Sequence, residues 1–329
     1  SSIALRAVDL AAFGLVVWLL QQILKDGGVS RAGRTWAGAL CLLFYFSISE
    51  WCHCQRDMWL MVPSLAWLWL RGRQVQRIAN GPVSAGRVFG WAIVEGLVLG
   101  AGIWIKPMVL VPAAVAWLAG TCWVRDWRCS VWDVLGLLLG GLAMGTAGGL
   151  WLVASGVWPY FWETFLEWNP RYVAAGKEHW TLHRFAGMCL RLFPWLLLHV
   201  PAVGLVAAGV LRGRRPVPRE RMPAGGAGPP VAVLAGAFYV GWLIQALALQ
   251  HLFDYVHAPG VLLAILTCGV VAGSCPAGRP AARVGWIAFA AVALLVSPAV
   301  RWSRLACWDD CLRHGSSAEI RDRLTRMQF

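Results

Sequence analysis

Long runs of apolar residues alternate with short polar connections, and this alternation constrains the fold of the chain more than any other feature. Ten windows almost free of charge recur along the 329 residues, at about 7–24, 35–49, 58–70, 88–105, 107–123, 131–153, 186–211, 230–249, 257–273 and 284–300. A helix that crosses a bilayer needs about 20 mostly apolar residues. Several windows are shorter and 58–70 is the weakest, so we predict eight to ten spans.

The composition agrees with a chain that is solvated by lipid. Hydrophobic residues make up 59% of the sequence and charged residues 14%, whereas a soluble domain carries about 25% charged residues. Lipid offers no hydrogen-bond partners to the backbone, and the alternating pattern of a membrane barrel is absent. We therefore predict an all-α, polytopic transmembrane helical bundle over residues 1–300, followed by a tail at 301–329.

The basic residues divide the connections into two groups. The segments at 25–34, 71–87, 125–128, 212–221 and 279–283 hold sixteen of the 29 Lys and Arg residues. The intervening connections at 50–57, 106, 154–185 and 250–256 hold five. The positive-inside rule places the first group in the cytoplasm and the second outside. Topology thus explains the net charge of +13, and we do not expect nucleic acid as a partner.

This orientation places both the start of the sequence and the tail outside. The chain begins "SSIALRAVDL", with neither an initiator Met nor a signal-peptide pattern. One further helix upstream would reconcile the start with the topology, so we expect an upstream helix and a first external loop that precede Ser1.

Most Glu, His and Tyr residues fall in the four external connections. Acids and imidazoles at the membrane boundary are costly without water, a partner or a substrate, so these connections are the candidate site. Lys106 stands between two apolar runs, either as a snorkelling cation at a helix end or as a point charge for a phosphate.

The stretch "SEWCHCQRDMW" at 49–59 is the most polar of these connections. Arg56, with Gln55 beside it, suits bidentate recognition of phosphate or carboxylate. Glu50 or Asp57 would orient the arginine or act as a base. The alternative is that Asp57 is the N-cap of a helix.

Cysteines in the same stretch raise the question of a metal site. Cys52-His53-Cys54 does not match the spacing of closed zinc sites, so we predict no metal site there. A disulfide within or between this pair and Cys307/Cys311 is an open alternative in an oxidising compartment.

Two further connections carry candidate side chains. In "FLEWNPRY", Trp168, Asn169 and Tyr172 suit sugar recognition, although Trp and Tyr are also typical of an interfacial belt. In "FDYVHAPG", Asp254 and His257 are candidates for acid–base work, with Tyr255 between them, and a polar turn is the simpler alternative. The catalytic candidates are therefore Glu50, Asp57, Asp254 and His257, and the substrate-binding candidates are Gln55, Arg56, Lys106, Trp168, Asn169, Tyr172 and Tyr255.

The order of four segments, "CQRDMWLMVPSLAWLWL", "GLVLGAGIWIKPMVLVPAAVAW", "FWETFLEWNPRY" and "FDYVHAPGVLLAIL", resembles bacterial polytopic glycosyltransferases of the GT-C type, which include protein mannosyltransferases and the aminoarabinose transferase of lipid A. The resemblance spans about residues 40–270. It implies transfer of a sugar from a polyprenyl-phosphate carrier to a lipid or glycan acceptor, on the outer face of the bacterial inner membrane, often with a divalent metal.

The resemblance also has a gap. Its catalytic acid usually lies in the first external loop, which we expect upstream of Ser1, so the chain as given would supply the surrounding wall. By the resemblance, Arg56 and Lys106 are expected at the carrier phosphate, and Asp254, Tyr255 and His257 on the far side.

Two other classes of function stay open. A transporter or lipid flippase would place ionisable residues inside its spans, and Glu95 and Asp133 are the acids that lie there, with Asp9 near an end. A non-catalytic membrane protein is the third alternative.

Overall fold

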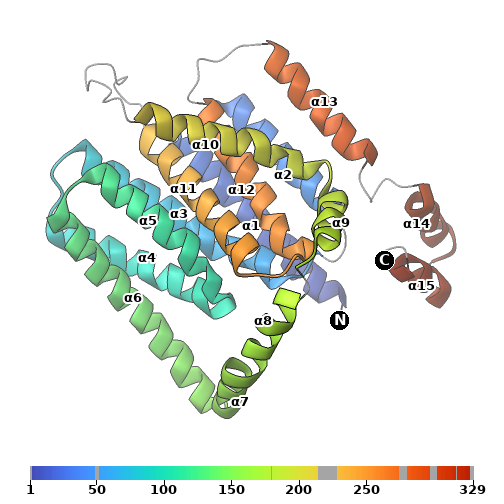
Figure 1. Cartoon of the computed structure of the whole chain (residues 1–329), viewed down its shortest axis with the longest axis horizontal. Coiled ribbons are helices and arrows are strands. Elements are labelled where there is room, and N and C mark those ends of the chain that lie inside the picture. Colours follow the sequence, from blue (N-terminus) through green and yellow to red (C-terminus); the bar gives the residue numbers. More distant parts are fainter. Residues whose placement is uncertain are drawn as a thin grey trace.

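The computed structural model describes residues 2–48, 52–178, 180–213, 228–273, 280–296, 302–315 and 317–326, and within these ranges all regular structure is helical (Figure 1). The helices up to residue 154 are α1 (Ser2–Asp26), α2 (Arg31–Ser47), α3 (Arg56–Asn80), α4 (Ala85–Ile105), η2 (Pro107–Val109), α5 (Leu110–Val124) and α6 (Trp127–Ala154). Those that follow are α7 (Trp158–Glu163), η3 (Thr164–Trp168), α8 (Asn169–Glu178), α9 (Leu182–Leu192), η4 (Trp195–Leu198), α10 (His199–Gly213), α11 (Gly228–Ala248), α12 (Asp254–Gly273), α13 (Pro280–Val296), α14 (Trp302–His314) and α15 (Ala318–Arg326).

The prediction of an all-α polytopic bundle is confirmed. In the described part of the chain, six helices are long and apolar enough to cross a membrane, and a bent pair brings the number to seven. The bent pair corrects one prediction. The window at 186–211 is not one continuous helix, because α9 and the segment Trp195–Gly209 meet at an angle of 91°. Pro194 lies at the break, where it cannot continue the hydrogen bonding of a helix.

The centre of the bundle is α12, which Figure 1 shows surrounded by α1, α2, α10 and α11. Its side chains from Val261 to Leu266 are at most 3% exposed. By contrast, α6 lies at the edge and leaves Leu138, Leu142 and Leu150 more than half exposed. A helix that is apolar all round belongs in a core, and an apolar outer face belongs in lipid, so both patterns fit a bundle within a membrane.

Close packing of α4 against α6 depends on glycine. A Cβ at Gly96 would overlap the carbonyl oxygen of Leu137, and a Cβ at Gly140 would overlap that of Ile93. Each helix carries glycines four residues apart, "GLVLG" at 96–100 and "GLLLG" at 136–140. Small residues at this spacing let two membrane helices approach until their backbones touch.

Where the structure describes them, the two groups of connections lie at opposite ends of the bundle. We call the end where α3, α5 and α12 begin the polar end, because it gathers the connections after Ser47, Ile105, Ala154 and Ala248. We call the other the basic end. There the carboxylate of Asp26 accepts a hydrogen bond from Trp69 of α3 and forms an ion pair with Arg73 of the same helix. Figure 1 shows α7 and α8 at the polar end and the turn between α5 and α6 at the basic end.

One cation was assigned to the wrong environment. Arg71 was counted in a basic connection at 71–87, but α3 continues to Asn80 and the side chain of Arg71 is 3% exposed. When an arginine after an apolar window has partners inside the protein, the helix continues past it, and a helix end predicted at that arginine is too early.

Candidate functional site

A buried ion pair joins two of the predicted site residues at the polar end. Lys106 is the C-cap of α4, and its Nζ lies 2.6 Å from Oδ1 of Asp57, which is 3% exposed. Asp57 is therefore not the N-cap of α3. That position belongs to Gln55, whose side chain makes no capping hydrogen bond, and Asp57 lies in the first turn, where a carboxylate also favours the positive end of the helix.

The ammonium of Lys106 has a second partner, which connects it to the α11–α12 connection. It donates to Oε1 of Gln250, and the amide nitrogen of Gln250 donates in turn to Oε1 of Gln245 on α11. Burial lowers the pKa of Lys106, although the Asp57 carboxylate opposes that shift. The cation is thus held by two oxygen acceptors at the end of the bundle and is not a free snorkelling lysine.

Asp254 has an arginine partner that the sequence did not indicate. Nε of Arg191 on α9 lies 2.8 Å from both carboxylate oxygens of Asp254, at the start of α12. The arginine side chain is 52% exposed and that of Asp254 is 10% exposed. Arg191 lies inside the apolar window at 186–211, which we predicted to be one span. A cation within such a window was the feature that could have marked it as a site residue.

The two ion pairs belong to one site. The thiol of Cys52 is 1% exposed and lies within electrostatic reach of Asp57, Arg191 and Asp254. Burial raises the pKa of Cys52 and the nearby carboxylates add to that shift, so its thiol stays protonated and is a poor metal ligand.

His257 and the tyrosines extend this site. His257 is 6% exposed and bonds the backbone of His251, while its Nε2 has no hydrogen-bond partner within the described residues. The side chain of Tyr255 lies near the hydroxyl of Tyr172 on α8, and the Tyr172 ring lies 4.3 Å from that of His251. His251 thus connects Tyr172 with His257, and Tyr255 lies beside Tyr172.

Other predicted residues lie at the rim. Arg56 is exposed at the first position of α3, beside Gln55. Trp168 is 58% exposed, with its ring stacked 5.0 Å from that of Tyr172, and Asn169 is exposed at the start of α8. Glu50 lies outside the described residues.

Asp9 forms a separate buried site at the same end. Its carboxylate accepts from the hydroxyl of Tyr45 at 2.5 Å and from Nε1 of Trp59 at 2.7 Å, and Nδ1 of His53 is 3.8 Å away. The histidine of "SEWCHCQRDMW" thus contacts an aspartate. The described cysteines of the proposed disulfides, Cys52, Cys54, Cys307 and Cys311, are free thiols.

The divalent metal that the resemblance implies finds no ligand set in the described part of the chain. No group of three or more His, Cys, Asp or Glu side chains there is arranged to hold a metal ion. Asp57 and Asp254 are each engaged by a cation, which competes with a metal for the carboxylate. We derive no step through a metal.

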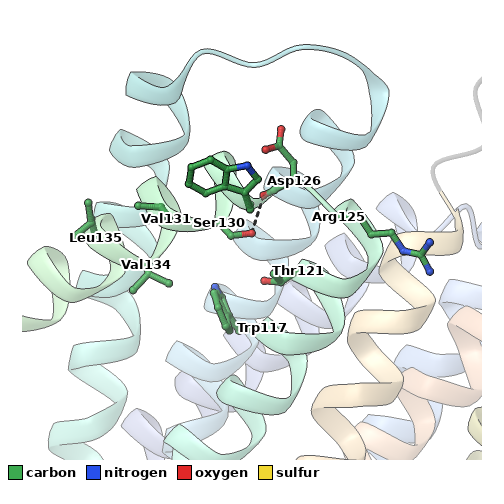
Figure 2. Close-up of a pocket in the computed structure, with 9 residues that line it drawn as sticks. Trp117, Thr121, Arg125, Asp126, Ser130, Val131, Val134 and Leu135 are labelled. Atoms are coloured by element: carbon green, nitrogen blue, oxygen red, sulfur yellow. Dashed lines mark hydrogen bonds between the residues drawn. The ribbon is translucent and has the colours of Figure 1, made fainter.

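A pocket of about 630 Å³ lies at the other end of the bundle. Figure 2 shows it between α5 and α6, with Trp117, Val131, Val134 and Leu135 around it and the side chain of Arg125 pointing away. Asp126 caps α6 by accepting from the backbone nitrogens of Arg128 and Cys129, and these bonds lower its pKa. This pocket contains none of the predicted site residues.

Comparisons with known proteins add no assignment: no family model, no curated protein and no solved structure matches the chain.

Proposed function

We propose that the chain is an integral membrane glycosyltransferase that uses a sugar carried on a polyprenyl phosphate. The observation that supports this function most directly is the convergence of two cation–carboxylate pairs, Lys106 with Asp57 and Arg191 with Asp254, at one end of a lipid-embedded bundle. A phosphate leaving group needs cations, and an acceptor hydroxyl needs a carboxylate. Both kinds of group are present at the polar end.

The cations have distinct roles in this proposal. Arg56 is exposed at the rim and Arg191 is half-exposed, so both can reach the phosphate of a carrier that lies in the bilayer. Lys106 supplies a fixed positive charge behind them. Asp57 and Gln250 hold its ammonium in place, so Asp57 acts as a positioning residue and not as the base.

The transfer step needs one proton acceptor. The hydroxyl of the acceptor attacks the anomeric carbon of the sugar, the bond from that carbon to the phosphate oxygen breaks, and the polyprenyl phosphate leaves with the bonding electrons. Asp254 takes the hydroxyl proton, and its release from Arg191 frees the guanidinium for the leaving phosphate. The unpartnered Nε2 of His257 is the second candidate for that proton.

The aromatic side chains around α8 suit the sugar. Trp168 and Tyr172 present a stacked pair of rings, and Asn169 follows directly with an amide for hydroxyl groups. The charge asymmetry of the connections puts this end outside, as expected for an enzyme of the bacterial inner membrane that takes its donor from the outer leaflet and gives the sugar to a lipid or glycan. Glu50 would add a further acid.

Binding of the carrier is the direct test, because the sugar is not known. The full chain in nanodiscs is titrated with a polyprenyl phosphate and with the matching neutral polyprenol, and binding is followed by native mass spectrometry. We expect the phosphate to bind at least 10-fold more tightly than the alcohol, about 1.4 kcal/mol. Arg56→Ala should remove most of that preference, because it removes an exposed cation and leaves the fold unchanged.

Arg171→Ala is the matched control, since Arg171 is an exposed cation of the same end that pairs only loosely, at 4.0 Å, with Glu167. The preference should survive this change. Equal binding of phosphate and alcohol by the wild-type chain, or a phosphate preference that Arg56→Ala leaves intact, refutes the carrier site. Transfer from a panel of polyprenyl-phosphate sugars, lost in Asp254→Asn, then tests the chemistry.

Transport is the second candidate function. It is favoured by the Arg71–Asp133–Glu95 cluster, which lies within the helices and not at the polar end. Substrate flux across proteoliposomes that is abolished by Glu95→Gln, with no sugar transfer by the wild-type chain, supports it over the transferase.

A further inference from the structure

Three charged side chains meet in the interior of the bundle. They are Arg71 of α3, Glu95 of α4 and Asp133 of α6, which are 2%, 0% and 2% exposed. Glu95 is at the midpoint of α4, about 15 Å from either end of that helix at 1.5 Å per residue. Two carboxylates share one guanidinium, so the cluster carries an uncompensated negative charge if both acids are ionised. Such a charge is very costly away from water.

Hydrogen bonding distinguishes the two carboxylates. Oδ1 of Asp133 accepts from Arg71 at 2.6 Å and from Gln74 at 2.8 Å. Its Oδ2 accepts from Arg71 at 2.6 Å and from Nε1 of Trp117 at 2.7 Å. A carboxylate that accepts several donors, two of them from a bidentate arginine, is stabilised in its charged form. Asp133 is therefore the counter-ion of Arg71.

Glu95 has almost none of this support. Among the described residues its one polar contact is from Oε2 to Nη1 of Arg71, at 3.4 Å, and that nitrogen already donates to Asp133 at 2.6 Å. Oε1 of Glu95 is buried without a partner among the described residues. An unpaired buried carboxylate takes up a proton in preference to holding its charge.

We propose that Glu95 is a proton-binding site inside the bundle, occupied at neutral pH, so that the Arg71–Asp133–Glu95 cluster is electrically neutral. The proton makes Oε1 of Glu95 a hydrogen-bond donor. Oε1 of Gln74, on the same cluster, is a buried acceptor that has no partner within the described residues. One proton thus neutralises the excess negative charge of the cluster and provides a hydrogen-bond donor where Gln74 has an acceptor without a described partner.

The surroundings favour a proton over a metal cation. The elements packed against α4 are α3, α6 and η2. Arg71 faces Glu95 from α3 and Asp133 faces the cluster from α6, while η2, with the sequence "PMV", has no titratable side chain. The guanidinium within 3.4 Å repels a second cation, and a proton needs no further oxygen ligands.

Loss of the proton changes the packing of α4. Glu95 directly precedes Gly96, whose Cα lies against the backbone of α6. Ionised Glu95 would compete with Asp133 for Arg71 and place a net charge at this contact. Above the ordinary pKa of glutamate, about 4.3, the folded chain binds one proton more than the unfolded chain. Stability therefore falls with rising pH until Glu95 ionises in the folded protein.

Infrared difference spectroscopy of the full chain in lipid, recorded through a pH titration, tests the proposal. We expect the carbonyl band of a protonated carboxylic acid at pH 7, absent in Glu95→Gln and unchanged in Asp126→Asn, a control at an exposed helix cap. Glu95→Gln mimics the neutral acid, so it should fold like wild type and lose the fall in unfolding midpoint that begins above about pH 4.3. Asp133→Asn should lower the midpoint, since it removes the negative charge beside Arg71 and one of the two oxygens that accept two hydrogen bonds each.

Three results overturn the proposal. The first is an infrared band that persists in Glu95→Gln, or is absent from the wild-type chain at pH 7. The second is a fall in unfolding midpoint with rising pH that Glu95→Gln retains in full. The third is a Glu95→Gln variant as unstable as Asp133→Asn, because an ionised, structural Glu95 could not be replaced by a neutral amide.

Discussion

Removal of the Asp57 carboxylate isolates the ion pair at the polar end. In Asp57→Ala, the Lys106 ammonium loses the acceptor at 2.6 Å and keeps only the Gln250 amide oxygen. The change leaves the first turn of α3 intact in other respects, because the Asp57 side chain does not cap the helix.

The magnitude follows from burial. Removal of one partner of a buried ion pair costs about 3–5 kcal/mol, because the other charge is left without compensation. The Asp57 side chain is 4% exposed but that of Lys106 is 18% exposed, and Gln250 remains, so we expect the lower end, about 3 kcal/mol. The double variant Asp57→Ala/Lys106→Met removes both charges and should lose only about 1 kcal/mol, since no buried charge is left alone.

Unfolding of the full chain by SDS in mixed micelles, followed by circular dichroism, measures these differences. Lys106→Met completes the double-mutant cycle. Glu167→Ala is the matched control, because its pair with Arg171 is 4.0 Å long, with the two side chains 64% and 81% exposed, and exposed pairs contribute little. It should leave the midpoint unchanged.

Two outcomes refute this reasoning. A loss below about 1 kcal/mol in Asp57→Ala would mean that water or lipid headgroups solvate Lys106, so that the site is not buried in its native setting. A double variant that loses the sum of the single losses would mean that the two side chains do not interact.

Two further predictions address the helix packing and the pH dependence. Gly140→Leu should separate α4 from α6 and lower stability by about 1–3 kcal/mol, whereas Gly141→Leu should not, because a Cβ at Gly141 meets nothing within 4 Å; equal losses in the same unfolding assay would contradict this packing. Burial lowers the pKa of Lys106, so between its folded pKa and the ordinary lysine value the unfolded chain binds more protons, and stability should rise with pH. Binding of polyprenyl phosphate should weaken over the same range, and Lys106→Met should remove both trends; affinity that holds up to about pH 10.4, the ordinary lysine pKa, would contradict the shift.

Much of the architecture was predictable from local features. The described residues of the ten apolar windows lie almost entirely on helices, because a continuous apolar run is recognisable without knowledge of its neighbours. The exception at 186–211 carried its own signal, Pro194, since proline cannot continue a helix. The glycine spacing at 96–100 and 136–140 was also visible, but only the structure pairs these two helices.

The candidate site was predictable in part. Charge asymmetry and polarity placed Asp57, Lys106 and Asp254 at the same end of the bundle, and the structure agrees. Arg191 was missed because it was read as part of a span. Arg71 was assigned to a connection because an arginine after an apolar run usually marks the end of a helix. In the structure Arg71 is buried and forms an ion pair with Asp133.

The sequence by itself determined that the chain is a helical, multi-pass membrane protein with strongly basic connections at one end and acid- and histidine-bearing connections at the other, because hydrophobicity and charge act on each segment separately. Only the tertiary structure decided which charges are partners. Lys106 contacts Asp57 across 49 positions, Arg191 contacts Asp254 across 63, and Arg71 contacts Asp133 across 62. Such pairs depend on which helices are neighbours and on how far each is rotated, and these are set by packing of the whole bundle.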